Sequence, residues 1–172
     1  LADFGVRRGR PEARDSLHEV VRGGCGQIEL SEGEIRGSAI ELLLEDYREL
    51  KGTYDHIVSI EMFEAVGHEN YDKYFDVCDK RLAPGGTMLL QTITMNEQRF
   101  GRYLRDYDWI QKHVFPGSEL ASIRGILESV ANVTGMSLYH AEDIGAHYAR
   151  TLNAWRKRFH AAAADLPSMG FD

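Results

Sequence analysis

The fold of this chain is decided by the stretch Tyr54–Ile60, YDHIVSI, in which apolar and β-branched residues follow one another almost without interruption. Such a run is typical of a strand buried on both faces of a parallel sheet. Apolar side chains then recur at helical spacing over residues 69–82, and Pro84-Gly85-Gly86 leads through a turn into a second apolar run over residues 87–93. Strand, helix, turn and strand in this order predict a right-handed βαβ unit.

The rest of the chain extends this pattern in both directions. The sequence predicts a strand over residues 40–44 and another over 136–144. It predicts helices over residues 96–113, over 122–134 with Ser122 as N-cap, and over 146–163 with one apolar stripe. Alternating strands and helices indicate an α/β fold with a mostly parallel sheet. Ligands of such sheets bind outside the carboxyl ends of the strands, which here are Asp46-Tyr47 and residues 61–67 and 93–96.

Length and composition limit the class of protein. The chain has 172 residues, 43% hydrophobic and 27% charged, which suits one domain with a real core. A formal net charge of -7 argues against a nucleic-acid partner. Cys25 and Cys78 are too far apart in sequence for a zinc motif, so no metal is predicted and a reducing cytoplasm is favoured. Residues 1–38 show no period and are interpreted as a poorly defined N-terminal remnant, with residues 39–172 forming a partial domain.

Three ordered blocks of sequence resemble one known enzyme family, the cyclopropane-fatty-acyl-phospholipid synthases and mycolic-acid methyltransferases. The blocks are Asp46-Tyr47-Arg48 with residues 54–68, residues 82–93, and residues 109–117 with residues 148–155. The resemblance implies a Rossmann-like methyltransferase fold that is incomplete at both ends. It further implies S-adenosylmethionine as methyl donor, an unsaturated acyl lipid as substrate, and a bound bicarbonate or carbonate ion.

Carried over by position, the resemblance also implies site residues. The expected ion-binding and catalytic residues are Glu64, Gln91, Ile93 and Tyr148. The expected donor-binding residues are Asp46, Tyr47, Ser59, Gly24 and Gly26. Gln91 departs from the family, which often has His there, and a neutral amide cannot titrate near neutral pH as His does.

The chemistry of this family would place special demands on the site. An alkene is a weak nucleophile, and its attack on a methyl group leaves a positive charge on carbon. Fixed negative charge, aromatic faces and exclusion of water would stabilise that charge, and Glu64 and Tyr148 could supply the first two. Cations interleaved with large aromatics, at residues 99–109 and 150–159, suit a lipid interface at the inner face of a membrane. The first cluster is interpreted as contacting the acyl chain, whereas a solvated helix face is the favoured interpretation of the second, around Trp155.

Other interpretations of these residues stay open on sequence alone. Glu64 could accept from backbone N–H groups at a helix start, and Tyr148 could pack in the core. Asp46 could simply end a strand, and the glycines at 23–26 could form a loop, because no strand precedes them. The chain as a whole could be a truncated, non-catalytic remnant of such an enzyme, or a methyltransferase for another small molecule.

Overall fold

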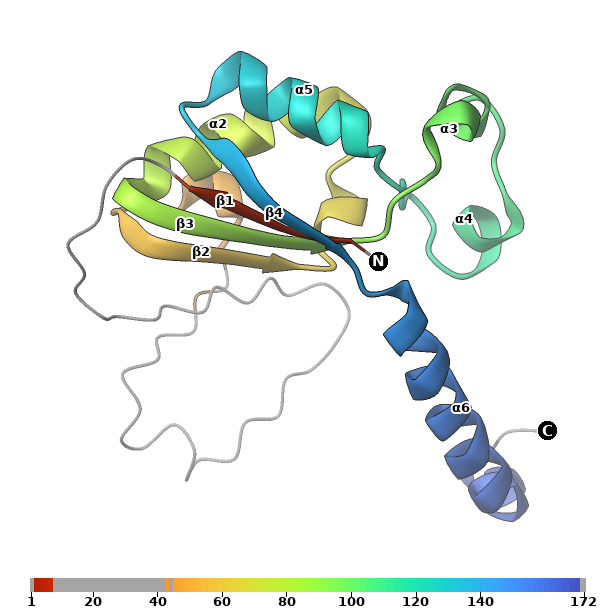
Figure 1. The fold of residues 1–172 in the computed structure, drawn as a ribbon. Coiled ribbons are helices and arrows are strands. Elements are labelled where there is room, and N and C mark those ends of the chain that lie inside the picture. The colour runs from red at the N-terminus through yellow and green to blue at the C-terminus, as the bar shows by residue number, and fades with distance from the viewer. Residues whose placement is uncertain (1, 8–42, 44, 171–172) are drawn as a thin grey trace, which may run out of the picture.

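The computed structural model describes residues 2–7, 43 and 45–170, and these form an α/β layer structure (Figure 1). A four-stranded sheet has the strand order β2-β3-β1-β4, and helices α2 and α5 both lie over one of its faces. The strands are β1 (Ala2–Arg7), β2 (Tyr54–Ile60), β3 (Leu82–Thr92) and β4 (Ser137–Asp143). The α-helices are α2 (Tyr71–Arg81), α3 (Glu97–Tyr103), α4 (Trp109–His113), α5 (Ile123–Val133) and α6 (Gly145–Ala162).

The predicted βαβ unit is present, as β2, α2 and β3. The two strands pair in parallel, with Ile57 opposite Met88, and α2 connects them. The register shifts near the start of β3, where the predicted turn at Pro84-Gly85-Gly86 is built into the strand as a bulge. Gly86 is required there, because a Cβ atom would lie 2.7 Å from the Asp55 carbonyl oxygen.

Three of the four described strands, β2, β3 and β4, run in the same direction, as expected for a mostly parallel sheet. β1 lies between β3 and β4 and is antiparallel to both, so one of the three strand pairs in the described sheet is parallel. This strand was not predicted from the sequence, because the alternation of Ala2, Phe4 and Val6 with other residues covers only six positions. Since β1 is antiparallel to both neighbours, β2, β3 and β4 all end at the same edge of the sheet. This edge, formed by Ile60, Thr92 and Asp143, is called the carboxyl rim below.

The core lies between the sheet and the two helices that cover it. Its largest fully buried apolar side chains are Phe63, Tyr74, Phe75, Leu82, Met88 and Leu90. Phe63 alone contacts three aromatic rings of α2, at centroid distances between 4.5 and 5.5 Å. Such aromatic contacts add about 0.5–1.5 kcal/mol each to the burial of apolar area. Phe63 therefore fixes the loop after β2, and with it the neighbouring Glu64, against the core.

One helical prediction needed correction. The helix predicted over residues 96–113 is two short helices, α3 and α4, because Asn96 and Asp108 each cap a separate start. The helix predicted over residues 146–163 is confirmed as α6, and the 3-10 segment η4 (Ala163–Met169) follows it. The helix with Ser122 as N-cap is confirmed as α5. Most of the strand predicted over residues 40–44 lies outside the described residues, and the division of the chain at residue 38 stays a prediction.

Helix α6 leaves the body of the structure at the carboxyl rim and projects away from the sheet (Figure 1). None of its residues is buried against the described part of the chain. Its predicted stripe is present, but Leu152, Trp155 and Phe159 are 49–59% exposed. No helix in the described ranges combines the length and the apolar character that crossing a membrane would require.

Candidate active site at the carboxyl rim

Glu64 lies at the carboxyl rim, in the short 3-10 helix η2 (Phe63–Ala65) that follows β2. Its carboxylate Oε1 accepts hydrogen bonds from the Thr92 hydroxyl at 2.9 Å and from the Ile93 backbone N–H at 2.5 Å. Both donors belong to the end of β3, so one carboxylate joins the two parallel strands where they end. The N–H group therefore comes from the neighbouring strand and not from the start of Glu64's own helix.

The other oxygen of Glu64, Oε2, is buried and has no hydrogen-bond partner among the described residues. A buried carboxylate oxygen without a donor is unfavourable by roughly 1–3 kcal/mol or more. The arrangement thus holds one half of the carboxylate firmly and leaves the other half buried and without a donor among the described residues. An O–H or N–H group that reached this oxygen would satisfy it.

Gln91 is placed one residue before this contact and pairs with a residue that the sequence analysis did not single out. Its amide Nε2 donates to Glu61 Oε1 at 3.3 Å, and the Glu61 backbone N–H donates to the Gln91 carbonyl at 2.9 Å. Glu61 has φ 51°, in the left-handed region that residues other than glycine rarely adopt. Backbone strain of this kind concentrates at functional sites, but nothing in the local sequence could have revealed it.

Tyr148 lies near the start of α6, five residues after β4 ends at the carboxyl rim. The register places this start close to β3, because Ala2 pairs with both Thr92 and Asp143. The ring of Tyr148 is half-buried and packs edge-on against Trp155, with centroids 6.4 Å apart. Both predicted residues lie at the carboxyl rim, but no hydrogen bond joins Tyr148 to Glu64 within the described ranges.

The predicted donor-binding residues are not gathered in the same way. Asp46 caps the 3-10 helix η1 (Tyr47–Glu49), and its carboxylate accepts from the Arg48 backbone and guanidinium, with an ion pair at 2.6 Å. Tyr47 packs against Tyr74 of α2, with centroids 5.4 Å apart. Ser59 is buried in β2, on the side of Tyr74. Gly24 and Gly26 lie outside the described residues.

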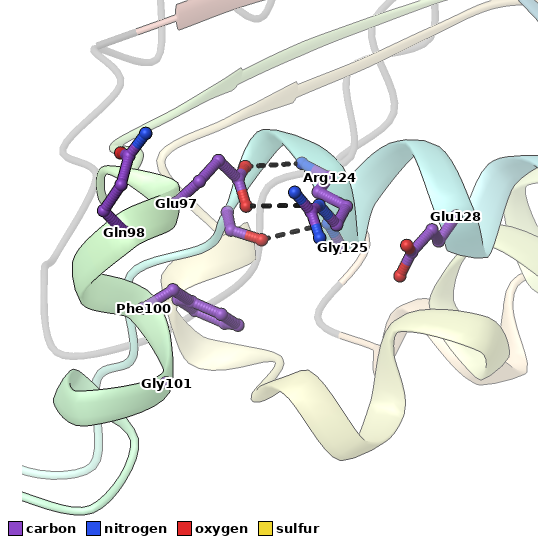
Figure 2. A pocket seen from close by; sticks show the side chains of 8 residues that line it. Glu97, Gln98, Phe100, Gly101, Arg124, Gly125 and Glu128 are labelled. Atoms are coloured by element: carbon purple, nitrogen blue, oxygen red, sulfur yellow. Dashed lines mark hydrogen bonds and ion pairs between the residues drawn. The ribbon is translucent and has the colours of Figure 1, made fainter.

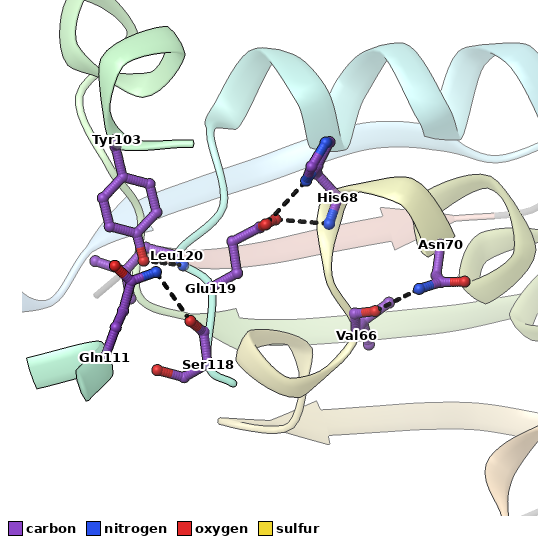
Figure 3. A network of polar contacts seen from close by, with 8 residues as sticks. All are labelled: Val66, His68, Asn70, Tyr103, Gln111, Ser118, Glu119 and Leu120. Carbon is purple, nitrogen blue, oxygen red and sulfur yellow. Dashed lines mark hydrogen bonds and ion pairs between the residues drawn. The ribbon is translucent and has the colours of Figure 1, made fainter. Parts of the chain in front are cut away.

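A network of polar contacts that the sequence did not predict supports the rim (Figure 3). The backbone N–H of Glu119 donates to the Glu64 carbonyl at 2.8 Å, and its carboxylate accepts from His68. The phenol of Tyr103 accepts from the Leu120 backbone N–H at 2.9 Å. Burial raises the pKa of Tyr103. The Glu119 contacts link segments more than 50 residues apart, and no local pattern signals them.

A shallow pocket lies apart from these residues, between α3 and α5 (Figure 2). It measures about 310 Å³ and is closed at one end by Glu97, which accepts from the Arg124 backbone N–H at 2.7 Å. Glu97 also lies 3.9 Å from the Arg124 guanidinium. None of the residues predicted for the site lines this pocket, and its Glu–Arg pair is satisfied internally.

Comparison with known proteins agrees with this geometry. The family described as mycolic acid cyclopropane synthetase matches residues 27–170. The chain is 39% identical to tuberculostearic acid methyltransferase UfaA1 of Mycobacterium tuberculosis, over 79% of this chain and 32% of the relative. It is 40% identical to the cyclopropane-fatty-acyl-phospholipid synthase of Escherichia coli K12, over 81% of this chain and 35% of the relative.

Solved structures give the same result for the fold. Mycolic acid cyclopropane synthase CmaA1, complexed with SAH and CTAB, superposes with a TM-score of 0.63 at 30% identity, covering 75% of this chain and 50% of that one. The predicted methyltransferase fold is thereby confirmed for the part of the chain that is matched. The chain spans about a third of the length of the curated relatives and half of the solved one. By sequence and by structure, the chain belongs to the mycolic acid cyclopropane synthetase family.

Proposed function

We propose that the protein carrying this chain transfers a methyl group from S-adenosylmethionine to the double bond of an unsaturated fatty acyl chain. The observation that carries the proposal is Glu64, a carboxylate fixed at one oxygen by the end of β3 and open at the other. The family supports the reaction class, because its named members include a tuberculostearic acid methyltransferase and cyclopropane synthases. Gln91 stands where the family often has His, so the proposed product is either a cyclopropane ring or a methyl branch.

The open oxygen of Glu64 fits a bicarbonate ion better than a carbonate ion. Bicarbonate carries an O–H group that can donate to Oε2, whereas carbonate has acceptors only, and two acceptors would repel each other. Bound there, the ion would supply a base for the proton that leaves the methylated chain. Glu64 would hold it by accepting a hydrogen bond from its O–H group, and Thr92 with the Ile93 N–H would keep Glu64 in place.

The residues expected to bind the donor fit it less well as they lie. Asp46 uses its carboxylate on Arg48, and Ser59 is buried in the core. Donor binding is proposed from the relatives, one of which was solved with SAH. When bound, S-adenosylmethionine supplies an electrophilic methyl group.

The acceptor chain is proposed to approach along α6, from a membrane surface. Tyr148 begins an apolar stripe at the rim, and Leu152, Trp155 and Phe159 continue it along the exposed helix. On an ideal helix Arg156 and Arg158 flank this stripe at about 80° on either side. α6 has no acidic residue, and four of its residues are Arg or Lys, in a chain with net charge -7. Large apolar side chains flanked by cations are typical of a helix lying on an anionic lipid surface.

Calorimetry with S-adenosylhomocysteine tests donor binding by this chain directly. A Kd below about 100 μM, roughly -5.5 kcal/mol, supports the proposed enzyme. No binding at millimolar concentration favours the alternative, a remnant that cannot hold the donor. Mass spectrometry of lipids from expressing cells tests the reaction, with new cyclopropane or methyl-branched chains as the expected products. Glu64→Gln should abolish those products, and Glu128→Gln, a change at an exposed site on α5, should not.

Co-sedimentation with vesicles tests the lipid surface. The double variant Arg156→Glu/Arg158→Glu should bind vesicles of anionic phospholipid at least tenfold more weakly, because each cation near such a surface is worth about 1 kcal/mol. Lys51→Glu/Lys73→Glu, an equal change of charge at exposed sites away from α6, is the matched control. Equal losses in the two double variants would show a general charge effect and would rule out α6 as the contact.

A further inference from the structure

We propose that Glu119 is a positioning residue for Glu64, acting as a clamp that holds the loop after β2 against the loop after β3. Glu119 itself makes three hydrogen bonds to the segment 64–68, which carries Glu64. The name Glu119 clamp is used below for these three bonds. The clamp is a property of the described residues, whereas its consequence for catalysis rests on the function proposed above.

The Glu119 clamp makes hydrogen bonds to both ends of the segment 64–68. At one end, the Glu119 backbone N–H donates to the Glu64 carbonyl at 2.8 Å. At the other end, the Glu119 carboxylate accepts from the His68 backbone N–H at 2.6 Å and contacts the His68 ring Nδ1 at 2.8 Å (Figure 3). Bonds to a charged acceptor are roughly twice as strong as neutral ones. One residue thus contacts both ends of the segment 64–68, and Val66 between them packs in the core.

The clamp is itself anchored to the end of β3. Ala121, two residues after Glu119, forms a parallel bridge with Thr94, and its carbonyl accepts from the Met95 N–H at 2.6 Å. The Ala121 N–H donates to the Ile93 carbonyl at 3.4 Å. Glu119 therefore connects the backbone that carries Glu64 to the backbone that carries Ile93, the donor to the Glu64 carboxylate. The segment 119–121 thus holds the Glu64 carboxylate and the Ile93 N–H at hydrogen-bonding distance from each other.

Further side chains keep this third segment in place. The Leu120 N–H donates to the buried Tyr103 phenol, and the Gln111 amide donates to the Ser118 carbonyl at 3.1 Å. Tyr71 lies beneath the same region: its pKa is raised by burial first and then by the negative charges of Glu119 and Glu64. The side chain of Glu119 is 20% exposed, so its bonds to His68 are partly shielded from water.

Hydrogen exchange tests the clamp without any assay of activity or of ligand binding. In Glu119→Ala the backbone bond to the Glu64 carbonyl stays, but both bonds between His68 and the carboxylate are lost. The Ile93 amide should then exchange at least about tenfold faster, because the segment that carries its acceptor Glu64 is held at one end only, and loss of a bond to a charged group has an effect of this size. The Ile126 amide, which donates to Ser122 in α5 at 3.1 Å, serves as the internal reference and should keep its rate. Glu119→Gln keeps an acceptor for the His68 N–H and should restore most of the protection of Ile93.

Two results would overturn the proposal. One is an unchanged rate at Ile93 in Glu119→Ala; the other is an equal acceleration at Ile93 and Ile126, which would mean general destabilisation. If Glu119→Ala does not fold, Glu119→Asp gives the same reading, because the shorter side chain keeps the charge but withdraws the carboxylate from His68. Glu69→Ala, at an exposed site next to His68, is the matched control and should change the exchange rate of neither Ile93 nor Ile126. Failure of donor binding in calorimetry would leave these results untouched.

Discussion

Removing the hydroxyl of Thr92 should weaken the fold through Glu64 alone. Thr92 is fully buried, and its hydroxyl donates to Glu64 Oε1 at 2.9 Å. In Thr92→Val the shape of the side chain is retained, β-propensity does not suffer, and the carboxylate oxygen keeps one donor, the Ile93 N–H. A hydrogen bond to a charged group is worth about 1.5–3 kcal/mol, so the free energy of unfolding should fall by about 2 kcal/mol.

A double-mutant cycle isolates this bond from other effects of the substitution. Unfolding in urea is measured for the wild type, Thr92→Val, Glu64→Ala and the double variant. The coupling free energy between Thr92 and Glu64 should exceed about 1 kcal/mol, in the range seen for residues in direct contact. Thr92→Ser, which keeps the hydroxyl, should retain that coupling. A coupling below about 0.5 kcal/mol would refute the reasoning, because independent sites already give that value.

Three further perturbations have expected outcomes. Gly86→Ala should lower the free energy of unfolding by about 1–3 kcal/mol, since the new Cβ would lie 2.7 Å from a backbone oxygen; Gly101→Ala, with open space around it, is the control, and both are measured by urea denaturation. Ser122→Ala should cost about 1 kcal/mol in the same assay, because the hydroxyl caps α5 through the Gly125 N–H at 3.0 Å. Burial raises the pKa of Cys78 from 9.0 to about 12, so the unfolded thiol ionises first and stability should fall by about 1.4 kcal/mol per pH unit as pH rises above about 9. Urea melts at pH 8 and pH 10.5 should show a smaller fall in Cys78→Ala, and an identical fall would contradict the assignment.

Patterns with a short period in the sequence predicted the fold well. The apolar run at 54–60 and the helical spacing after Glu69 gave β2 and α2, and a good N-cap at Ser122 gave α5. Each of these features depends on neighbours a few residues away, which is what periodicity and capping report. The prediction of one helix over residues 96–113 was wrong for a related reason. Asn96 and Asp108 each cap a separate helix within one polar stretch, and the spacing of apolar residues alone does not separate the two helices.

The long-range pairings could not be predicted in this way. β1 owes its place to hydrogen bonds with β3 and β4, which lie 80 or more residues away, and its six residues alternate over too short a stretch to predict those partners. Glu119 is an ordinary polar residue in a loop until the fold brings His68 and Glu64 to it. For the site, the family resemblance pointed to Glu64, Gln91, Ile93 and Tyr148. Only the folded structure could show that one carboxylate oxygen of Glu64 accepts hydrogen bonds and that the other has no donor among the described residues.

The two ligands of the proposed reaction would then depend on different parts of the chain, and their binding should be separable. The ion side of the site is built from described residues that hold one another, with Glu64 fixed by Thr92, Ile93 and the Glu119 clamp. The donor side relies on Asp46, which is already paired with Arg48, and on glycines outside the described residues. A chain that fails to bind the donor can therefore still present a formed acceptor for bicarbonate. Carbon-13 NMR with labelled bicarbonate should detect that binding in the wild type and lose it in Glu64→Gln, whether or not S-adenosylhomocysteine binds. Bicarbonate binding that survives in Glu64→Gln would break the link between Glu64 and the ion.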